Sequence, residues 1–258
     1  MYPIAHKDTR GGHNRININS NFFKTWSPQM AYVLGFIFAD GAIEDVQLSS
    51  RTCYLSITSK DLSILKRIRC SMNSRHRFYK KKVEFITYSN GKTYKSNERY
   101  VLRVGSKSIY NDLLKLGVTP RKSLTITFPN CPLNLINFFI RGYFDGDGCL
   151  HLQKNKYPRV IFTSGSLNFL VGLSQTMLKI LNVEAYPLSI RMTPGKNPCY
   201  QLYYSNINSK KILEFLYRNL DQAPYLERKF QIYQNYLEKS GVTTPPPGQW
   251  RNFSIIDT

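Results

Sequence analysis

The sequence predicts an α+β fold of two pseudo-symmetric αββαββα subdomains that pack together through their first helices. Two apolar segments, 31–41 and 138–148, align through Gly35 with Gly142, an offset of 107 positions. After each segment, apolar residues recur first in the two-residue period of a strand and then in the period of a helix. The same order in both halves indicates a duplicated unit.

The composition indicates a globular protein with a polyanionic partner. The chain of 258 residues is 42% hydrophobic and 14% aromatic, which is enough for a substantial core. Its 36 Lys and Arg against 16 Asp and Glu give a net charge of +20. Self-repulsion at that charge destabilises the folded chain unless a polyanion offsets it, so nucleic acid is the first partner to consider.

The residue pattern argues against a membrane protein and against a structural zinc site. No stretch is long and apolar enough to span a bilayer, and the polar N-terminus lacks a secretory signal. The five cysteines are scattered without a C-x-x-C pair, which indicates reduced thiols. We therefore expect an intracellular protein, in an organelle matrix or a prokaryotic cytoplasm, which the sequence does not distinguish.

Prolines mark the borders of the predicted segments. Ser27 is placed to cap a helix with Pro28 at its first position, and Pro129 and Pro132 precede the second apolar segment. The expected segments are an N-terminal arm, a first subdomain, a second subdomain and an extended tail, at 1–26, 27–127, 128–240 and 241–258.

The same patterns predict the elements that follow each opening helix. In the first half we expect strands and helices in the order 42–51, 54–58, helix 60–72, 78–88, 100–104 and helix 108–116. An Asn-Gly pair within 89–92 favours a tight hairpin turn. In the second half the order is 149–155, 159–163, helix 167–181, 185–191, 200–204 and helix 210–220.

Small residues one turn apart allow the two opening helices to approach closely. Gly35 with Ala39, and Gly142 with Gly146, have the spacing at which helix backbones can touch. Such packing brings the C-termini of the two helices together. The first helix ends in Asp40 and the second in Asp147. These carboxylates repel each other and the negative helix ends, so we expect a bound cation.

Mg²⁺ suits such a site because it takes few carboxylates and completes its shell with water and phosphate oxygens. The last carbonyls of the two helices, at Ala39 and Gly146, are available as further ligands. Gly41 and Gly148 are expected to make the left-handed turn that ends each helix. For one aspartate alone an ordinary Asp-Gly turn is the simpler interpretation, but an in-register pair on a basic chain favours metal binding.

The two segments resemble the motif of the single-chain LAGLIDADG homing endonucleases. Residues 33–41 and 140–148 match its nine positions, and the resemblance extends over about 27–238. It implies a monomer whose antiparallel sheets form a DNA-binding saddle, and which cuts both strands of a long asymmetric DNA site to leave short 3′ overhangs. It also implies that Mg²⁺ supports cleavage, that Mn²⁺ substitutes for it, and that Ca²⁺ binds without supporting cleavage.

The resemblance assigns roles to further residues. Asp40 and Asp147 are the implied metal-binding catalytic carboxylates, and the other acidic position of the motif is Asp145 in the second copy but Phe38 in the first. A basic residue near the scissile phosphates, just before the last helix of each repeat, corresponds to Lys122 and Lys229, again 107 apart. Each lysine alone could equally be a solvated residue at a helix start. Ser59 and Ser164 match a polar position of a water network.

The strands after each aspartate are predicted to enter the major groove as ribbons. A phosphate contact or a solvated charge is the commoner role for any single residue, and a one-residue slip in register would turn half of them away. The predicted DNA-contacting residues are Gln47, Ser49, Arg51, Tyr54, Ser56, Arg75, Arg77, Lys80, Lys82, Lys92, Arg99, Arg103, His151, Gln153, Asn155, Arg159, Arg191, Lys196, Gln201 and Tyr203.

Three alternatives share this scaffold. An RNA maturase that binds intron RNA suits the charge equally well, but it has no need of the retained carboxylates and lysines. A non-catalytic transcription regulator would carry an added helix-turn-helix domain, for which the chain has no room. An intein-embedded endonuclease would start with a splicing Cys or Ser and end with His-Asn, so we expect a freestanding, intron-encoded enzyme.

Overall fold

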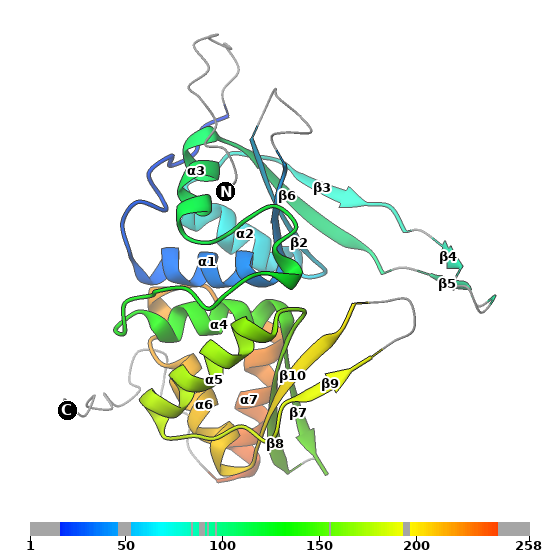
Figure 1. The fold of residues 1–258 in the computed structure, drawn as a ribbon, viewed down its shortest axis with the longest axis vertical. Coiled ribbons are helices and arrows are strands. Elements are labelled where there is room, and N and C mark those ends of the chain that lie inside the picture. The colour runs from blue at the N-terminus through cyan, green and yellow to red at the C-terminus, as the bar shows by residue number, and fades with distance from the viewer. Residues whose placement is uncertain are drawn as a thin grey trace.

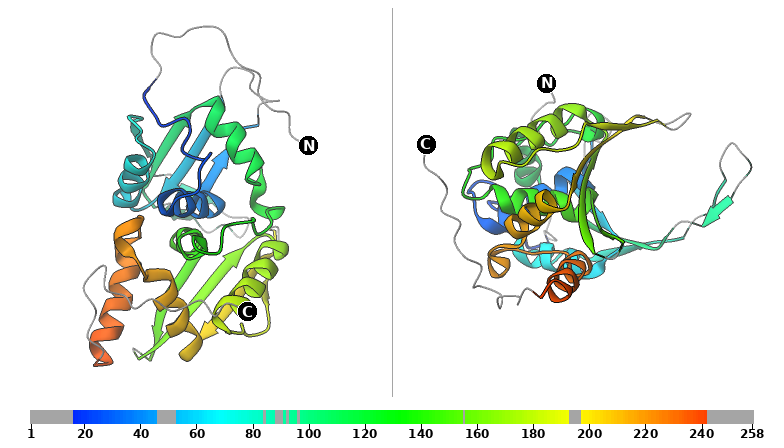
Figure 2. Two further views of the ribbon diagram at one scale, coloured as in Figure 1. Left: turned by 90° about the vertical axis from the view of Figure 1, so that its left-hand side faces the viewer. Right: turned by 90° about the horizontal axis from the view of Figure 1, so that it is seen from below.

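The computed structural model describes residues 16–45, 53–83, 85–87, 91, 93–95, 97–154, 156–192 and 197–241. Two antiparallel sheets lie one beyond the other, and helices α1 and α4 pack against each other between the two halves (Figure 1). Both sheets curve around one open, concave side, while the helices gather on the other (Figure 2). The predicted α+β architecture of two similar halves is confirmed.

The first half runs through α1 (Pro28–Asp40), β1 (Gly41–Ile43), β2 (Tyr54–Ser59), α2 (Leu62–Ser71), β3 (Phe78–Lys81), β4 (Phe85–Thr87), β5 (Thr93–Lys95), β6 (Arg99–Gly105), α3 (Lys107–Lys115) and the 3₁₀ turn η1 (Lys122–Leu124). The second half runs through α4 (Ile136–Asp147), β7 (Gly148–Gln153), β8 (Tyr157–Ser164), α5 (Leu167–Leu181), β9 (Ser189–Arg191), β10 (Cys199–Ser205), α6 (Ile207–Tyr217), η2 (Leu220–Gln222) and α7 (Glu227–Lys239).

Local sequence signals explain where the helices begin. The Ser27 hydroxyl accepts a hydrogen bond from the Met30 backbone N–H at 3.1 Å, and Pro28 occupies the first turn of α1, as predicted. Helix α5 has the predicted bounds. Across α1, residues 30–38 are all buried, which fits a helix that is covered on every side.

The two sheets have the same topology. Their strand orders are β1-β2-β6-β3 and β7-β8-β10-β9. In the first sheet Tyr100 pairs with Ser59 and Lys80, and in the second Tyr200 pairs with Ser164 and Ile190. The next pairs outward are therefore equivalent too. We call these, Lys81–Arg99 and Arg191–Cys199, the outer pairs.

Helices α1 and α4 touch backbone to backbone at two glycines. A Cβ atom on Gly35 would lie 1.9 Å from the Phe139 carbonyl oxygen, and one on Gly142 would lie 2.0 Å from that of Tyr32. Each of these residues is 107 positions from its counterpart, so the contact is reciprocal. The predicted close approach is confirmed, because only glycine fits at these two positions.

Three local predictions differ from the structure. Residues 17–23, expected in a separate arm, contact the first half: Phe22 and Phe23 are buried in its core, and the Asn19 N–H donates to the Met72 carbonyl. Lys122 is the first residue of a 3₁₀ turn rather than the residue before a helix, whereas Lys229 already lies inside α7. Strand β1 ends at Ile43, and the remainder of the predicted strand, 46–51, lies outside the described residues.

Candidate metal and DNA-binding site

Asp40 and Asp147 are the last residues of the two central helices, whose ends lie side by side. Both side chains are exposed, and Asp40 Oδ2 lies only 3.4 Å from the position that a Cβ on Gly146 would take. The Cβ of Ala39 is closer still, at 2.4 Å from the same position. The absence of a side chain at Gly146 therefore lets the end of α1, with Asp40, approach the end of α4.

Gly41 and Gly148 do not make the predicted left-handed turn. Their backbones are extended, with φ of −94° and −83°, so the chain passes from each helix directly into strand β1 or β7. Glycine is required by space instead, because a Cβ would lie 2.7 Å from the Ile37 carbonyl oxygen at Gly41. At Gly148 a Cβ would meet the Phe144 ring at 2.2 Å.

The surroundings favour the neutral form of the two carboxyls. Partial desolvation by the surrounding protein raises the pKa of Asp147 to about 6, and the negative charge of Asp40 adds to this rise. Desolvation raises the pKa of Asp40 as well, while Lys229 and Lys122 oppose the increase. A cation bound between these two carboxyl groups would stabilise their ionised forms.

Lys122 and Lys229 lie beneath the site and cap the central helices. Lys122 Nζ donates to the carbonyls of Phe38 at 2.7 Å and Ala39 at 3.3 Å, the last turn of α1. Lys229 Nζ donates to the carbonyls of Phe144, of Asp145 at 3.1 Å and of Gly148 at 2.5 Å. A cation at a helix C-terminus offsets the negative end of the helix dipole.

Burial changes the protonation of both lysines. Lys122 is 4% exposed and Lys229 is 3% exposed. Desolvation lowers the pKa of each lysine to about 8, although nearby carboxylates, Asp147 and Asp40 for Lys122 and chiefly Asp145 for Lys229, favour the charged form. The pKa of each lysine thus lies near neutral pH while its ammonium group is held by backbone carbonyls.

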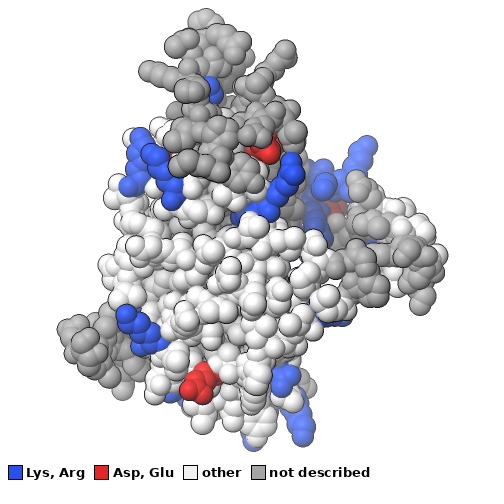
Figure 3. Space-filling model, in the orientation of Figure 1, with Lys and Arg blue, Asp and Glu red and all other residues white. Residues whose placement is uncertain are grey.

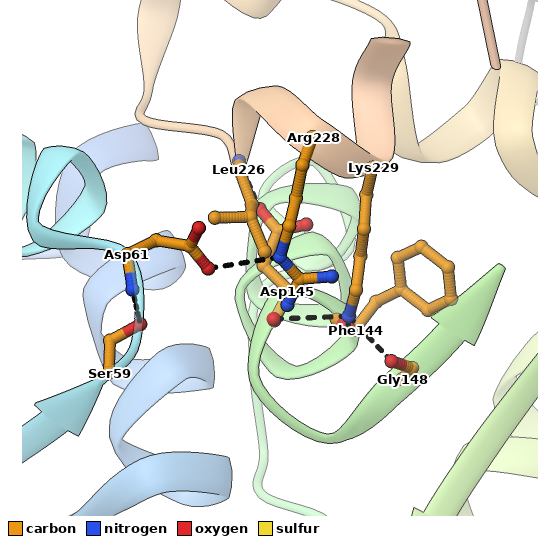
Figure 4. A network of polar contacts seen from close by, with 8 residues as sticks. All are labelled: Ser59, Asp61, Phe144, Asp145, Gly148, Leu226, Arg228 and Lys229. Carbon is orange, nitrogen blue, oxygen red and sulfur yellow. Dashed lines mark hydrogen bonds and ion pairs between the residues drawn. The ribbon is translucent and has the colours of Figure 1, made fainter. Parts of the chain in front are cut away.

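Asp145 is buried and joins three parts of the molecule. Its Oδ2 accepts hydrogen bonds from the Tyr32 hydroxyl of α1 at 2.7 Å and from the Leu226 N–H at the start of α7 at 2.8 Å. Figure 4 shows Asp145 beside Lys229, whose ammonium reaches the carbonyls at the end of α4. The first half has Phe38 at this position, so the brace exists only in the second half.

We expect Asp145→Ala to destabilise the fold markedly. The substitution leaves the Tyr32 hydroxyl and the Leu226 N–H without their acceptor, at roughly 1–3 kcal/mol for each buried donor. Urea denaturation followed by circular dichroism measures the loss. Tyr32→Phe removes one donor only and should cost about half as much; equal stability of Asp145→Ala and the unsubstituted chain would contradict the bracing role.

Two ion pairs connect the halves beside the site. Arg228 Nε contacts Asp61 Oδ2 at 2.9 Å, and Arg67 contacts Glu227 at 3.0 Å. Figure 4 shows the first pair spanning from α7 to the start of α2. These exposed pairs add little stability, but they place α7 and its Lys229 against the first half.

The second sheet presents the predicted residues on one face. His151 pairs with Arg159, and Gln201 and Tyr203 lie opposite Thr163 and Ile161 on the neighbouring strand. Leu150, Val160, Phe162 and Leu202 alternate with them and are buried. His151, Gln153, Arg159, Arg191, Gln201 and Tyr203 therefore share the open face of this sheet.

In the first sheet some of the predicted residues lie on the open face and one lies on the opposite face. Ser56 pairs with Arg103 on the open face, and Arg103 stacks on the Tyr54 ring at 3.8 Å and pairs with Glu44 at 2.5 Å. Lys80 points to the opposite face, because it pairs with Tyr100 and forms an ion pair with Glu98. Lys81, which the sequence did not single out, lies on the open face opposite Arg99.

The remaining predicted residues have varied positions. Arg75 and Arg77 are exposed in the loop before β3, and Lys82 follows it. Ser59 and Ser164 accept hydrogen bonds from the N–H groups of Asp61 and Ser166, so both hydroxyls bind the start of the following helix. Gln47, Ser49, Arg51, Lys92, Asn155 and Lys196 lie outside the described residues.

Arg141 is a buried residue whose role the sequence did not predict. It is fully buried, and its guanidinium donates to the carbonyls of Leu216, Arg218 and Ala223 at 3.1–3.3 Å. These bonds fix the segment that leads from α6 towards α7. A single arginine within an apolar helix was the visible signal, since a buried charge must have such partners.

The donor set fits a hard divalent cation. Two carboxylates and nearby backbone carbonyls are oxygen ligands, and Mg²⁺ commonly takes one or two carboxylates together with phosphate oxygens of a substrate. The Ala39 carbonyl already accepts from Lys122, which leaves its second lone pair for a metal. Within the described residues no cluster of three or more His, Cys, Asp or Glu could hold a metal by itself.

Surface charge is uneven. On the face seen in Figure 3, over α4 and α5, most of the surface carries neither acidic nor basic groups. Lys and Arg lie around the edges of this face, including the side from which the ribbon of β3 to β6 projects (Figure 3). Among the helices that the structure describes, none has the length and apolar character needed to cross a membrane.

Comparison with known proteins identifies the class of fold. Residues 134–219, one third of the chain, match the family model of a LAGLIDADG-like domain. The solved structure of mesophilic variants of the homing endonuclease I-DmoI has a TM-score of 0.51 at 17% identity, covering 84% of this chain and 99% of that one. The LAGLIDADG meganuclease I-AabMI bound to uncleaved DNA gives 0.46 at 13%, covering 84% and 92%.

The chain therefore has the fold of a LAGLIDADG homing endonuclease. Residues 134–219 match a LAGLIDADG-like domain, and the resemblance expected from the two motifs is confirmed to that extent.

The curated relatives are much longer proteins. A DNA polymerase of Acanthamoeba polyphaga mimivirus is 26% identical over 203 residues, which are 75% of this chain and 11% of that protein. A probable translation initiation factor of Methanocaldococcus jannaschii is 32% identical over 127 residues, 46% of this chain and 10% of that protein. The chain spans about a tenth of the length of these relatives, so their names describe the longer proteins.

Proposed function

We propose that the protein is a site-specific endonuclease that cuts both strands of duplex DNA with Mg²⁺. The observation that carries the proposal is the pair of exposed carboxylates, Asp40 and Asp147, at helix ends that touch and that each continue directly into a strand of a sheet. One carboxylate and one buried lysine from each half form a pseudo-twofold pair of centres. Such a pair can act on two strands of one duplex across the minor groove, leaving short 3′ overhangs.

In this proposal the residues of the chain divide the work. Asp40 and Asp147, with the carbonyls of Ala39 and Gly146, would hold the metal, which when bound supplies charge stabilisation to the phosphate and activates water. Lys122 and Lys229 hold the helix ends in place and, with pKa values near 8, remain able to exchange a proton at Nζ. The two open sheet faces position the duplex through phosphate contacts and base contacts.

A cleavage selection tests this function. The protein is incubated with a randomised duplex DNA library in Mg²⁺, and the cut ends are sequenced; in parallel the same library is bound in Ca²⁺. We expect one long asymmetric sequence to be cut in Mg²⁺ and only bound in Ca²⁺, with Mn²⁺ replacing Mg²⁺. Sequence-specific binding without cutting in any of these metals would indicate a regulator, and binding restricted to intron RNA would indicate a maturase.

The Mg²⁺ requirement should depend on pH. Because the pKa of Asp147 is raised to about 6, protons compete with the metal for this carboxylate below that pH. We expect the Mg²⁺ concentration for half-maximal cleavage to be constant from pH 7 to 8 and to rise by about tenfold per pH unit below about 6. Cleavage rates at graded Mg²⁺ and pH measure this, and a requirement that stays constant down to pH 5 would contradict the assignment.

A further inference from the structure

The outer hairpin of the first sheet is much longer than its counterpart in the second. Beyond the outer pair of the first sheet, the chain takes seventeen residues, 82–98, to return; beyond the outer pair of the second it takes seven, 192–198. The difference is ten residues, or five per strand. Figure 1 shows the result, a narrow ribbon ending in β4 and β5 that projects beyond the body of the molecule.

The added length is large on the scale of DNA. A strand advances about 3.3 Å per residue, so five residues extend the ribbon by about 16 Å. Base pairs are spaced about 3.4 Å apart along the duplex, so this distance corresponds to about five base pairs.

The two paired segments of the long ribbon, one at its base and one at its tip, have the same register. The pairs Phe78–Leu102 through Lys81–Arg99 and the pairs Phe85–Lys95 through Thr87–Thr93 are related without an extra residue on either strand. Because side chains alternate between faces, residues an even number of positions from Lys81 or Arg99 share their face. The tip therefore continues the open face with four side chains, those of Phe85, Thr87, Thr93 and Lys95.

The chemistry of these four side chains suits base edges. Phe85 is 72% exposed, more than any other large apolar residue in the described part of the chain, so its ring is accessible to a partner. A phenyl ring can contact the methyl group of thymine, threonine hydroxyls can bind most base edges, and lysine can bind guanine or phosphate. The hydroxyls of Thr87 and Thr93 already contact each other at 2.9 Å across the ribbon.

We propose that the β4–β5 ribbon is an additional DNA-reading arm, so that the half of the target bound by the first sheet is recognised over about five more base pairs than the other half. Phe85 is the thymine-reading residue of this arm, and Lys95 opposite it contacts guanine or phosphate. This inference rests on the proposed DNA-binding function and specifies how the site is read.

A trimmed protein tests the arm. Deleting 83–87 and 93–97 leaves a hairpin of seven residues, the length found in the second sheet. Both proteins are used to select sequences from a randomised duplex library in Ca²⁺, and their selected sites are footprinted. We expect the trimmed protein to lose base preference over about five base pairs at one end of the site only, with the centre and the other end unchanged.

Point variants give a second, independent reading if trimming disturbs folding. Phe85→Ala should weaken the preference for thymine at a single outer position by about tenfold. Tyr94→Ala is the matched control, because Tyr94 is 53% exposed on the opposite face of the same ribbon and should leave every preference unchanged.

The outcomes separate the two proposals. Unchanged preferences after trimming or after Phe85→Ala, in proteins that still select a specific site, would overturn the reading arm alone. If the unaltered protein selects no DNA sequence, the proposed function fails, and the arm fails with it. If Tyr94→Ala also weakened the base preference at the outer positions, the assignment would be overturned, because the effect would not depend on which face of the ribbon carries the side chain.

Discussion

Asp40→Asn and Asp147→Asn should each abolish double-strand cleavage while leaving sequence-specific DNA binding intact. Each substitution removes a charged oxygen ligand from the pair of helix ends. Metal ions contribute several kcal/mol of charge stabilisation to such reactions, so we expect the rate of linearisation to fall by roughly 10³-fold. A supercoiled plasmid carrying the selected site measures this, because linear and nicked products are resolved on a gel.

Binding supplies the complementary readout. Removing a carboxylate near the phosphates lessens repulsion, so affinity for the site in the absence of a divalent metal should stay equal or increase slightly. Asp221→Asn is the matched control, since this exposed aspartate lies in η2, outside the metal ligands assigned here. A variant at position 40 or 147 that linearises the plasmid at the normal rate would refute the metal assignment.

Gly35→Ala and Gly142→Ala should be the most destabilising glycine-to-alanine changes among the glycines that the structure describes. The new Cβ would lie 1.9–2.0 Å from a carbonyl oxygen of the facing helix, and backbone cannot rotate away as a side chain can. The helices must separate, which should cost about 3 kcal/mol or more. For a chain of this size the melting temperature should fall by roughly 6–12 °C.

Thermal unfolding followed by circular dichroism measures the effect. Gln175→Ala on the exposed face of α5 is the control, and it should change the free energy of unfolding by less than about 0.5 kcal/mol. Melting temperatures of the two glycine variants that match this control would contradict the close backbone contact. Cleavage by any folded glycine variant should also slow, because separation of the helices moves Asp40 away from Asp147.

Local sequence signals predicted much of the fold. The Ser27-Pro28 start of α1 and the bounds of α5 follow from capping and from apolar periodicity, which act over a few residues. The repeat offset of 107 predicted that α1 and α4 meet, because glycines one turn from small residues have little other use in an apolar helix. Capping, apolar periodicity and the spacing of small residues involve neighbouring positions, so they are visible in a single sequence.

The rest depends on contacts between distant residues. The burial of Lys122 against the end of α1 joins residues more than eighty positions apart, and nothing local distinguishes it from a solvated lysine. The face taken by Lys80 rather than Lys81 depends on pairing with β6, which is a matter of register. The left-handed turns expected at the Asp-Gly pairs did not form, because each strand continues directly from the preceding helix.

The reciprocal glycine contact has a consequence for how the two halves can change. The separation of the two aspartates is set by backbone resting on backbone, so it depends on few side chains outside α1 and α4. Each sheet is then free to drift in length and sequence without disturbing the chemistry, as hairpins of seventeen and seven residues illustrate. A duplicated protein built this way can come to recognise an asymmetric DNA site, which is bound in a single orientation. An ancestor with two identical halves would be limited to palindromic sites.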